Sequence, residues 1–291
     1  MGGWQRRARH TSEGRLALRI ITALALLPAV LWLIFSGGWW FASLALVVGT
    51  ICLYEFMEMT MPRDPWARAL FTTVGFLLMG LIITGGLVGS ASVLVLGFLP
   101  VASLVFFLFR TGDLDTVAAR AGLAVAGLLW AGALLSTMVL LRQLPEGPGW
   151  VLMACALAWG SDTGAYFGGR AFGRTPLYPK VSPKKTWEGS ISGVVSATGS
   201  AFFLQWLAGP HSVPAAHLLV LAPVAAVLGQ LGDLVESLVK RSTGVKDSGR
   251  IMPGHGGLLD RVDALLFVGP TVYAYALLVG QLEPVWLSLT P

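Results

Sequence analysis

The sequence has little charge and almost no cysteine. Of its 291 residues, 12% are charged and two are cysteine, whereas 55% are hydrophobic, and the mean hydropathy is +0.73. A soluble core of this size could not hide so much apolar surface. We therefore predict an integral membrane protein. Cys52 and Cys155 both fall inside apolar runs, which argues against a disulfide framework and against a cysteine-built metal site.

The apolar runs also lack the alternation of a membrane barrel, and the first run lacks a clear signal-peptide cleavage site. Helices satisfy the backbone hydrogen bonds in lipid and need about 20 apolar residues each. We predict an all-α, polytopic membrane protein with about nine transmembrane helices and a cytoplasm-facing active-site cavity. Residues 1–141 would hold spans one to five, and residues 142–291 the catalytic spans six to nine. The predicted spans are 17–36, 39–57, 69–86, 91–109, 121–141, 150–170, 190–208, 215–239 and 264–282.

Positive charge is almost absent from one side of this arrangement. Nine spans place 19 of the 20 lysines and arginines on one side and leave only Arg142 on the other. By the positive-inside rule, the N-terminus and the two long loops are cytoplasmic, and the C-terminus lies outside the inner membrane. The same partition accounts for the net charge of +5, so no nucleic-acid partner is predicted.

Few carboxylates interrupt the apolar runs, and each costs about 2.5–3.5 kcal/mol to insert. Asp162 lies well inside the sixth span, in AWGSDTGAYFGG. It could belong to a buried site, or it could hydrogen-bond a neighbouring helix. The glycines near it recur at roughly helical spacing, which predicts close approach of another helix or a ligand. They are Gly160, Gly164, Gly168 and Gly169.

Three further carboxylates are predicted to converge at the cytoplasmic ends of the last two spans. Asp233 lies on a polar face near the end of span eight, where Glu236 is interpreted as an ordinary helix end at the interface. Asp260 and Asp263 share one face of the first turn of span nine. Helix capping or pairing with Arg261 could also explain why two carboxylates lie there. Mutual repulsion makes such a cluster unfavourable without a cation. Oxygen ligands without a His or Cys cluster favour magnesium, which usually brings phosphates with it.

Basic residues surround these carboxylates. Topology alone would explain any one of them, but together they are typical of a phosphate site. His255, in PGHGG, could be a general base, a phosphate donor or a turn residue. Walker A, HExxH and GxSxG patterns are missing from the sequence. The basic residues are Lys184 and Lys185 in SPKKTWEGS, and Lys240, Arg241, Lys246 and Arg250 in the loop after span eight.

Residues 237–263, SLVKRSTGVKDSGRIMPGHGGLLDRVD, closely resemble the C-terminal signature of the phosphatidate cytidylyltransferases, or CDP-diacylglycerol synthases. Met252 stands where that family more often has Leu, Ile or Phe, a conservative departure. The stretches SDTGAYFGGRAFGR and SPKKTWEGSISG are similar to earlier motifs of the family. The resemblance covers the second half of the chain.

The resemblance implies a polytopic inner-membrane enzyme that converts CTP and phosphatidate into CDP-diacylglycerol and pyrophosphate. It implies Mg²⁺ with an accompanying K⁺ ion, and a homodimer. Asp260, Asp263, Lys246 and His255 are the predicted catalytic residues. The predicted metal ligands are Asp233, Asp260, Asp263 and Asp162. The predicted substrate-binding residues are Lys184, Lys185, Lys240, Arg241 and Arg261.

Three other functions are considered. A transporter or channel also uses buried carboxylates, but no repeat relates the two halves of the chain. A CDP-alcohol phosphotransferase would carry an Asp-Gly-initiated motif, and the sequence contains no Asp-Gly dipeptide. A CTP-dependent lipid kinase would transfer the γ-phosphate of CTP, whereas a cytidylyltransferase transfers the α-phosphate.

Overall fold

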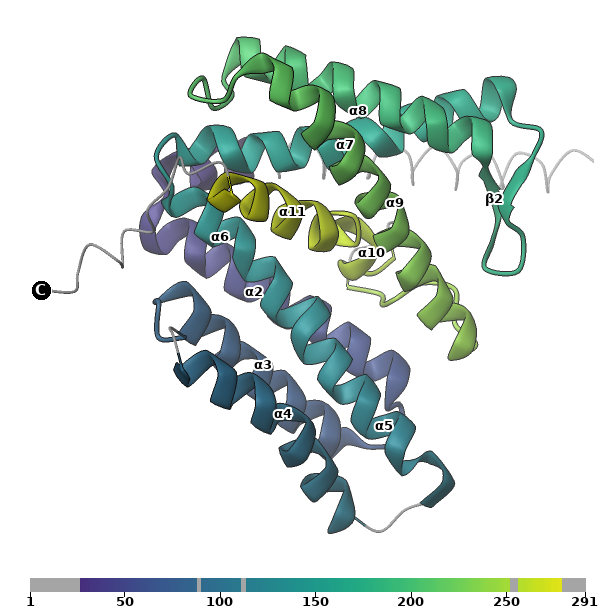
Figure 1. Cartoon of the computed structure of the whole chain (residues 1–291). Coiled ribbons are helices and arrows are strands. Elements are labelled where there is room, and N and C mark those ends of the chain that lie inside the picture. The colour runs from purple at the N-terminus through teal and green to yellow at the C-terminus, as the bar shows by residue number, and fades with distance from the viewer. Residues whose placement is uncertain (1–26, 88–89, 111–113, 252–255, 279–291) are drawn as a thin grey trace, which may run out of the picture.

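The structure is a computed structural model, and it describes residues 27–87, 90–110, 114–251 and 256–278. It consists mostly of long helices (Figure 1). A helix over Leu27–Ser36 comes first. It is followed by α2 (Gly38–Thr60), α3 (Pro65–Ile83), α4 (Ser90–Leu108), α5 (Leu114–Gly127), α6 (Ser136–Gln143), α7 (Gly147–Phe172), α8 (Trp187–Leu207), α9 (Leu218–Ser242), α10 (Leu259–Val262) and α11 (Leu265–Leu278).

The membrane character predicted from composition is confirmed. Five helical segments are long and apolar enough to cross a membrane, and two further apolar helices, Leu27–Ser36 and Ser92–Leu108, are shorter. The described helices overlap all nine predicted spans, although 17–26 and 279–282 lie outside the described residues. The count of nine membrane crossings stays a prediction. The five long segments are Gly38–Thr60, Pro65–Ile83, Leu114–Gln143, Ala215–Ser242 and Leu259–Leu278.

The fifth predicted span is longer than expected and is not a uniform α-helix. Between α5 and α6 the chain forms a π-helical turn at Leu128–Gly132 and a 3-10 turn at Ala133–Leu135. The helical path nevertheless continues from Leu114 to Gln143. Trp130 in the π-helical turn packs edge-on against Phe56 of α2, with ring centroids 5.5 Å apart. The irregular turn therefore lies in the apolar core.

The all-α prediction holds for the membrane helices but omits one element. Strands β1 (Pro176–Tyr178) and β2 (Ser182–Thr186) form an antiparallel hairpin between α7 and α8, which projects from the helices (Figure 1). Residues of the hairpin are largely exposed or half-buried. Long apolar runs do not reveal this hairpin, because its strands are short and largely polar or exposed.

Helices α7 and α8 run side by side and approach closely (Figure 1). Glycines on α7 face serines on α8 so tightly that a Cβ at Gly164 would lie 2.8 Å from the carbonyl oxygen of Ser192. The close approach predicted from the glycine spacing is confirmed, and its partner is a helix. The facing pairs are Gly160 with Ser200, Gly164 with Ser196, and Gly168 with Ser192.

Helix α9 packs closely against α11, and two glycines make this possible. A Cβ at Gly229 would lie 2.9 Å from Val268 Cγ2, and one at Gly232 would lie 3.0 Å from the carbonyl oxygen of Asp263. Larger residues would push the helices apart. Because Asp233 follows Gly232 directly, this contact brings carboxylates of the two segments together.

Candidate functional site

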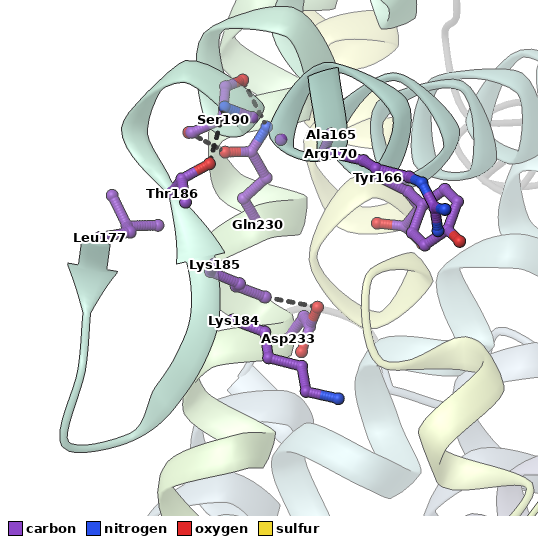
Figure 2. A pocket seen from close by; sticks show the side chains of 13 residues that line it. Ala165, Tyr166, Arg170, Leu177, Lys184, Lys185, Thr186, Ser190, Gln230 and Asp233 are labelled. Atoms are coloured by element: carbon purple, nitrogen blue, oxygen red, sulfur yellow. Dashed lines mark hydrogen bonds and ion pairs between the residues drawn. The ribbon is translucent and has the colours of Figure 1, made fainter. Parts of the chain in front are cut away.

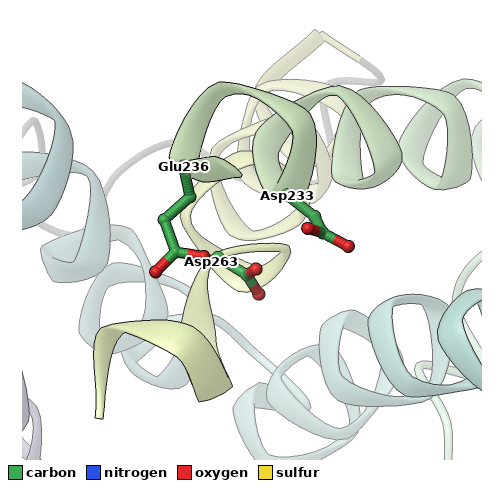
Figure 3. Close-up of side chains that lie close together, drawn as sticks. All are labelled: Asp233, Glu236 and Asp263. Atoms are coloured by element: carbon green, nitrogen blue, oxygen red, sulfur yellow. The ribbon is translucent and has the colours of Figure 1, made fainter. Parts of the chain in front are cut away.

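Three carboxylates from α9 and the segment joining α10 to α11 form an acidic group. Asp233, Glu236 and Asp263 each offer an oxygen within 4.8 Å of the others, and Figure 3 shows the three side chains together. Glu236 is fully buried and Asp263 is 9% exposed, whereas Asp233 is half-buried. Carboxylates this close repel one another, so the arrangement favours a bound cation.

Glu236 carries the strongest sign that a ligand belongs here. Its Oε2 accepts a hydrogen bond from Lys240 Nζ at 2.7 Å, but its buried Oε1 has no hydrogen-bond partner among the described residues. Leaving a buried acceptor unpaired is costly. An oxygen-only set with one unpaired oxygen therefore suits a hard cation such as Mg²⁺.

The interpretation of Glu236 as an ordinary interfacial helix end was wrong. Helix α11 packs along α9, and the Glu236 side chain has no exposed surface. The sequence places Glu236 near the basic end of a span but does not reveal which segment covers that face. Its proximity to Asp263 depends on tertiary packing.

Asp260 lies beside the acidic group rather than within it. Its Oδ1 is 2.6 Å from Lys240 Nζ, and its Oδ2 accepts hydrogen bonds from the backbone amides of Ser248 and Gly257, both at 3.0 Å. Asp260 thus holds the loop before α10 against the end of α9. A direct role for Asp260 as a metal ligand stays a prediction.

Asp233 also lines a cavity of about 390 Å³. Figure 2 shows Lys184 and Lys185 on β2 and Asp233 on α9. Lys185 Nζ pairs with Asp233 Oδ2 at 2.5 Å, and the exposed Asp162 of α7 lies in the same lining. The cavity therefore brings together two predicted substrate-binding lysines and two predicted metal ligands.

A hydrogen-bonded amide fixes the wall of this cavity. Gln230 Nε2 donates to Ser161 Oγ and to the carbonyl oxygen of Ser190, both at 3.1 Å, and Ser190 Oγ donates to Gln230 Oε1. These bonds join α7, α8 and α9, and Figure 2 shows Gln230 beside Ser190. Gln230 shares a helical face with Asp233 in the sequence, which was the available signal for its position.

The remaining predicted residues lie around the loop between α9 and α10. Arg241 Nε donates to the carbonyl oxygen of Val181 at 3.4 Å, so it ties α9 to the hairpin. Lys246 is exposed and lines a separate depression, and Arg261 is exposed. His255 lies outside the described residues. The structure thus groups the carboxylates more closely than the basic residues.

One carboxylate in the first half was missed. Glu55 of α2 is fully buried and accepts hydrogen bonds from the backbone amides of Leu258 and Leu259, at 3.1 and 2.9 Å. The signal was present, because Glu55 is an acidic residue inside the predicted span 39–57.

Comparison with known proteins gives the family. Residues 17–279 match the profile of the cytidylyltransferase family, which includes the N-terminal half that carried no recognised motif. The chain is 35% identical to the phosphatidate cytidylyltransferase of Brucella melitensis biotype 1, covering 91% of this chain and 95% of that protein. It is 32% identical to the one of Bacillus subtilis, with coverages of 88% and 95%. It is 34% identical to the one of Pseudomonas aeruginosa, with coverages of 91% and 98%. The chain therefore belongs to the cytidylyltransferase family and is a nucleotidyltransferase.

Proposed function

We propose that the protein transfers the cytidylyl group of CTP to phosphatidate and so forms CDP-diacylglycerol and pyrophosphate. The names of its relatives support this activity, as does the resemblance of residues 237–263. The observation that carries the proposal is the position of Asp233. This residue belongs to the acidic group and also lines the lysine-containing cavity, so a cation site and a phosphate site would adjoin.

The reaction is an in-line displacement at phosphorus. A phosphate oxygen of phosphatidate attacks the α-phosphorus of CTP, and a new P–O bond forms. The bond from the α-phosphorus to the oxygen bridging the β-phosphate breaks, and its electrons leave with pyrophosphate. The nucleophile is already anionic, so no strong general base is needed. The protein must supply positioning and charge neutralisation.

The acidic group would hold the metal ion. Asp233, Glu236 and Asp263 supply oxygen atoms, with Asp162 and Asp260 as further predicted ligands. A bound Mg²⁺ would neutralise phosphate charge and orient the reacting oxygens. Lys240 forms ion pairs with both Glu236 and Asp260 and so holds these two carboxylates near each other. The accompanying K⁺ ion rests on the family resemblance alone.

The basic residues would receive the phosphates of the two substrates. Lys184 and Lys185 lie in the cavity, and Lys185 would exchange its contact with Asp233 for a phosphate oxygen when a cation neutralises the carboxylates. We assign a supporting catalytic role to His255. We assign contacts with more distal phosphate oxygens to three basic residues in and beside the α9–α10 loop, which are Arg241, Lys246 and Arg261.

We place the cavity on the cytoplasmic side of the inner membrane, with the N-terminus cytoplasmic and the C-terminus outside. Basic residues gather at that side. CTP would enter from the cytoplasm, while the acyl chains of phosphatidate stay in lipid. We further propose that the protein acts as a homodimer, as the family resemblance implies.

The test uses purified protein with phosphatidate in mixed micelles. We expect label from α-phosphate-labelled CTP to enter lipid in a Mg²⁺-dependent reaction, with one pyrophosphate released per lipid product. Label entering lipid from the γ-phosphate instead would indicate a lipid kinase. A protein that leaves CTP intact but conducts ions in proteoliposomes would refute the proposal in favour of a transporter or channel.

A further inference from the structure

Glu55 is a buried carboxylate in a largely apolar helix. It lies near the end of α2, between Tyr54 and Phe56, and its side chain is fully buried. A carboxylate in such a place is expensive unless its oxygens are satisfied. Its position therefore calls for specific partners.

Those partners all belong to the loop that carries the family signature. Glu55 Oε1 accepts from the amide of Leu258 at 3.1 Å. Oε2 accepts from the amide of Leu259 at 2.9 Å and from Ser248 Oγ at 3.2 Å. The two amides lie at the start of α10. One side chain of α2 thus contacts the loop between α9 and α10 at Ser248 and again where α10 begins.

Two glycines let the loop wrap around this carboxylate. A Cβ at Gly249 would collide with Glu55 Oε1. A Cβ at Gly257 would lie 2.7 Å from Glu55 Oε2 and would also collide with Ser248 Oγ. The backbone on both sides therefore approaches Glu55 more closely than any side-chain-bearing residue allows. The Glu55 carboxylate therefore packs directly against the backbone of the loop.

A short chain of contacts leads from Glu55 to the acidic group. Ser248 and Gly257 each donate a backbone hydrogen bond to Asp260 Oδ2, and Asp260 Oδ1 meets Lys240. Lys240 in turn meets Glu236. Asp263 follows one turn after Leu259. The backbone amide of Leu259 donates a hydrogen bond directly to Glu55. Displacement of the loop would therefore move Asp260 and Asp263 relative to α9.

We propose that Glu55 is a positioning residue for the reaction, through which the N-terminal half of the chain sets the geometry of the C-terminal site. This proposal rests on the proposed function. Glu55 does not reach the acidic group itself. It acts by fixing where α10 begins and hence where Asp260 and Asp263 lie.

A carboxylate suits this position better than an amide. Glu55 accepts three hydrogen bonds and donates none. In Glu55→Gln, one oxygen becomes an amino group that would face a backbone N–H or the Ser248 hydroxyl, so at least one bond is lost. Because small misplacements near reacting groups can reduce rates about 100-fold, we expect kcat of this variant to fall about 10- to 100-fold. KM for CTP should change less than about threefold, because the cavity lysines are untouched.

Glu146, whose side chain is exposed, provides a control with matching hydrogen bonds at the other end of α9. It precedes α7 and accepts from the amides of His211 and Ser212, at 3.3 and 3.1 Å, and from Ser212 Oγ at 2.7 Å. It thus makes the same set of contacts to the loop before α9 that Glu55 makes to the loop after it. Glu146→Gln should leave kcat and KM at the wild-type values while loosening its own loop.

The experiment compares Glu55→Gln, Glu146→Gln and wild type by steady-state kinetics and by amide hydrogen exchange with mass spectrometry. We expect faster exchange over residues 256–263 only in Glu55→Gln, and over residues 208–214 only in Glu146→Gln. Equal losses of kcat in the two variants would reduce Glu55 to a general stability role and overturn the proposal. Unchanged kcat or unchanged exchange in Glu55→Gln would also overturn it.

A milder variant keeps the test decisive if Glu55→Gln does not fold. Ser248→Ala removes the hydroxyl that donates to Glu55 and accepts from the Asp260 amide, but it keeps both backbone bonds to Glu55. We expect kcat to fall severalfold with faster exchange over residues 256–263, and wild-type values for both would refute the proposal. If wild-type protein itself lacks transferase activity, the proposed function fails, while the exchange data still decide whether Glu55 holds the loop.

Discussion

Lys240 Nζ lies 2.6 Å from Asp260 Oδ1, and this ion pair joins the end of α9 to α10. Lys240 is 8% exposed, and its ammonium also contacts Glu236 Oε2 at 2.7 Å. One buried cation therefore balances two carboxylates from different segments. The substrate-binding role of Lys240 stays a prediction, and its contacts in the structure are with two carboxylates at the acidic site.

Replacing Lys240 by Met should destabilise the protein strongly. Asp260 and the buried Glu236 would lose their shared cation, and breaking a buried ion pair from one side typically costs about 3–5 kcal/mol. Thermal unfolding in detergent would measure the effect. In Lys240→Met/Asp260→Asn, part of the stability should return because fewer uncompensated charges remain. A Lys240→Met protein as stable as wild type would contradict the buried ion pair.

Glu236→Gln should abolish the response to Mg²⁺ while sparing the fold. Removal of one charge relieves repulsion within the acidic group, so we expect Tm without metal to equal or exceed that of wild type. Mg²⁺ should raise the Tm of wild type by binding the folded state but should have little effect on the variant. Its turnover should fall by about 100-fold or more. EDTA-treated samples provide the baseline, and an equal rise in Tm for both proteins would rule out Glu236 as a ligand.

Joint replacement of Lys184 and Lys185 by Ala should impair the use of CTP. Two ammonium groups would leave the cavity, and Lys185 would no longer pair with Asp233. We expect kcat/KM for CTP to fall about 100-fold, because charge-assisted contacts to phosphate are lost. Lys180→Ala, on an exposed residue of the same hairpin, is the control. If kcat/KM for CTP stays at the wild-type value, membrane topology alone explains the two lysines.

Asp64, in the N-terminal half of the chain, should make a pH-dependent contribution to stability. Burial works to raise the pKa of its carboxyl, but hydrogen bonds from Arg110, the Ala67 amide and Arg120 outweigh it, so the pKa lies below the ordinary 3.8. Arg110 Nη2 lies 2.6 Å from Asp64 Oδ1, and Arg120 Nη2 lies 2.5 Å from Oδ2.

A group whose pKa is lower in the folded state stabilises that state above its unfolded pKa of about 3.9. This stabilisation is lost as pH falls through the folded pKa. Asp64→Asn should therefore lower Tm at pH 7, and the difference from wild type should shrink as pH falls from about 4 towards 3. Unfolding curves across that range would test this. A difference that is the same at pH 7 and pH 3 would show that the ionised carboxylate is not the source.

Much of the architecture followed from local patterns. Long apolar runs indicated the helices, because a membrane helix must be apolar along its whole length. The spacing of Gly160, Gly164 and Gly168 indicated a close contact, which α8 supplies. The hairpin at β1 and β2 escaped prediction, because strands of three and five residues carry no comparable signal.

The acidic site could be anticipated only in part. Asp233 and Asp263 were expected to converge, because one ends a span and the other begins the next. Glu236 was misjudged, since its burial depends on tertiary packing, which the spacing of residues along α9 does not reveal. Glu55 was recognisable as an acidic residue inside an apolar run, but its partners could not be predicted, because they lie about 200 positions later in the chain, where helical spacing carries no information.

The chain alone therefore settles its membrane character, its helices and its family, because these depend on composition, periodicity and a contiguous signature. Which carboxylates meet, and which carry unpaired oxygens, depends on how helices far apart in the sequence pack. The close contact at Gly232 brings Asp263 next to α9. Glu55 of α2 accepts a hydrogen bond from the backbone at the start of α10. Hydrogen bonds of this kind require fixed distances between segments, and only the folded chain sets those distances.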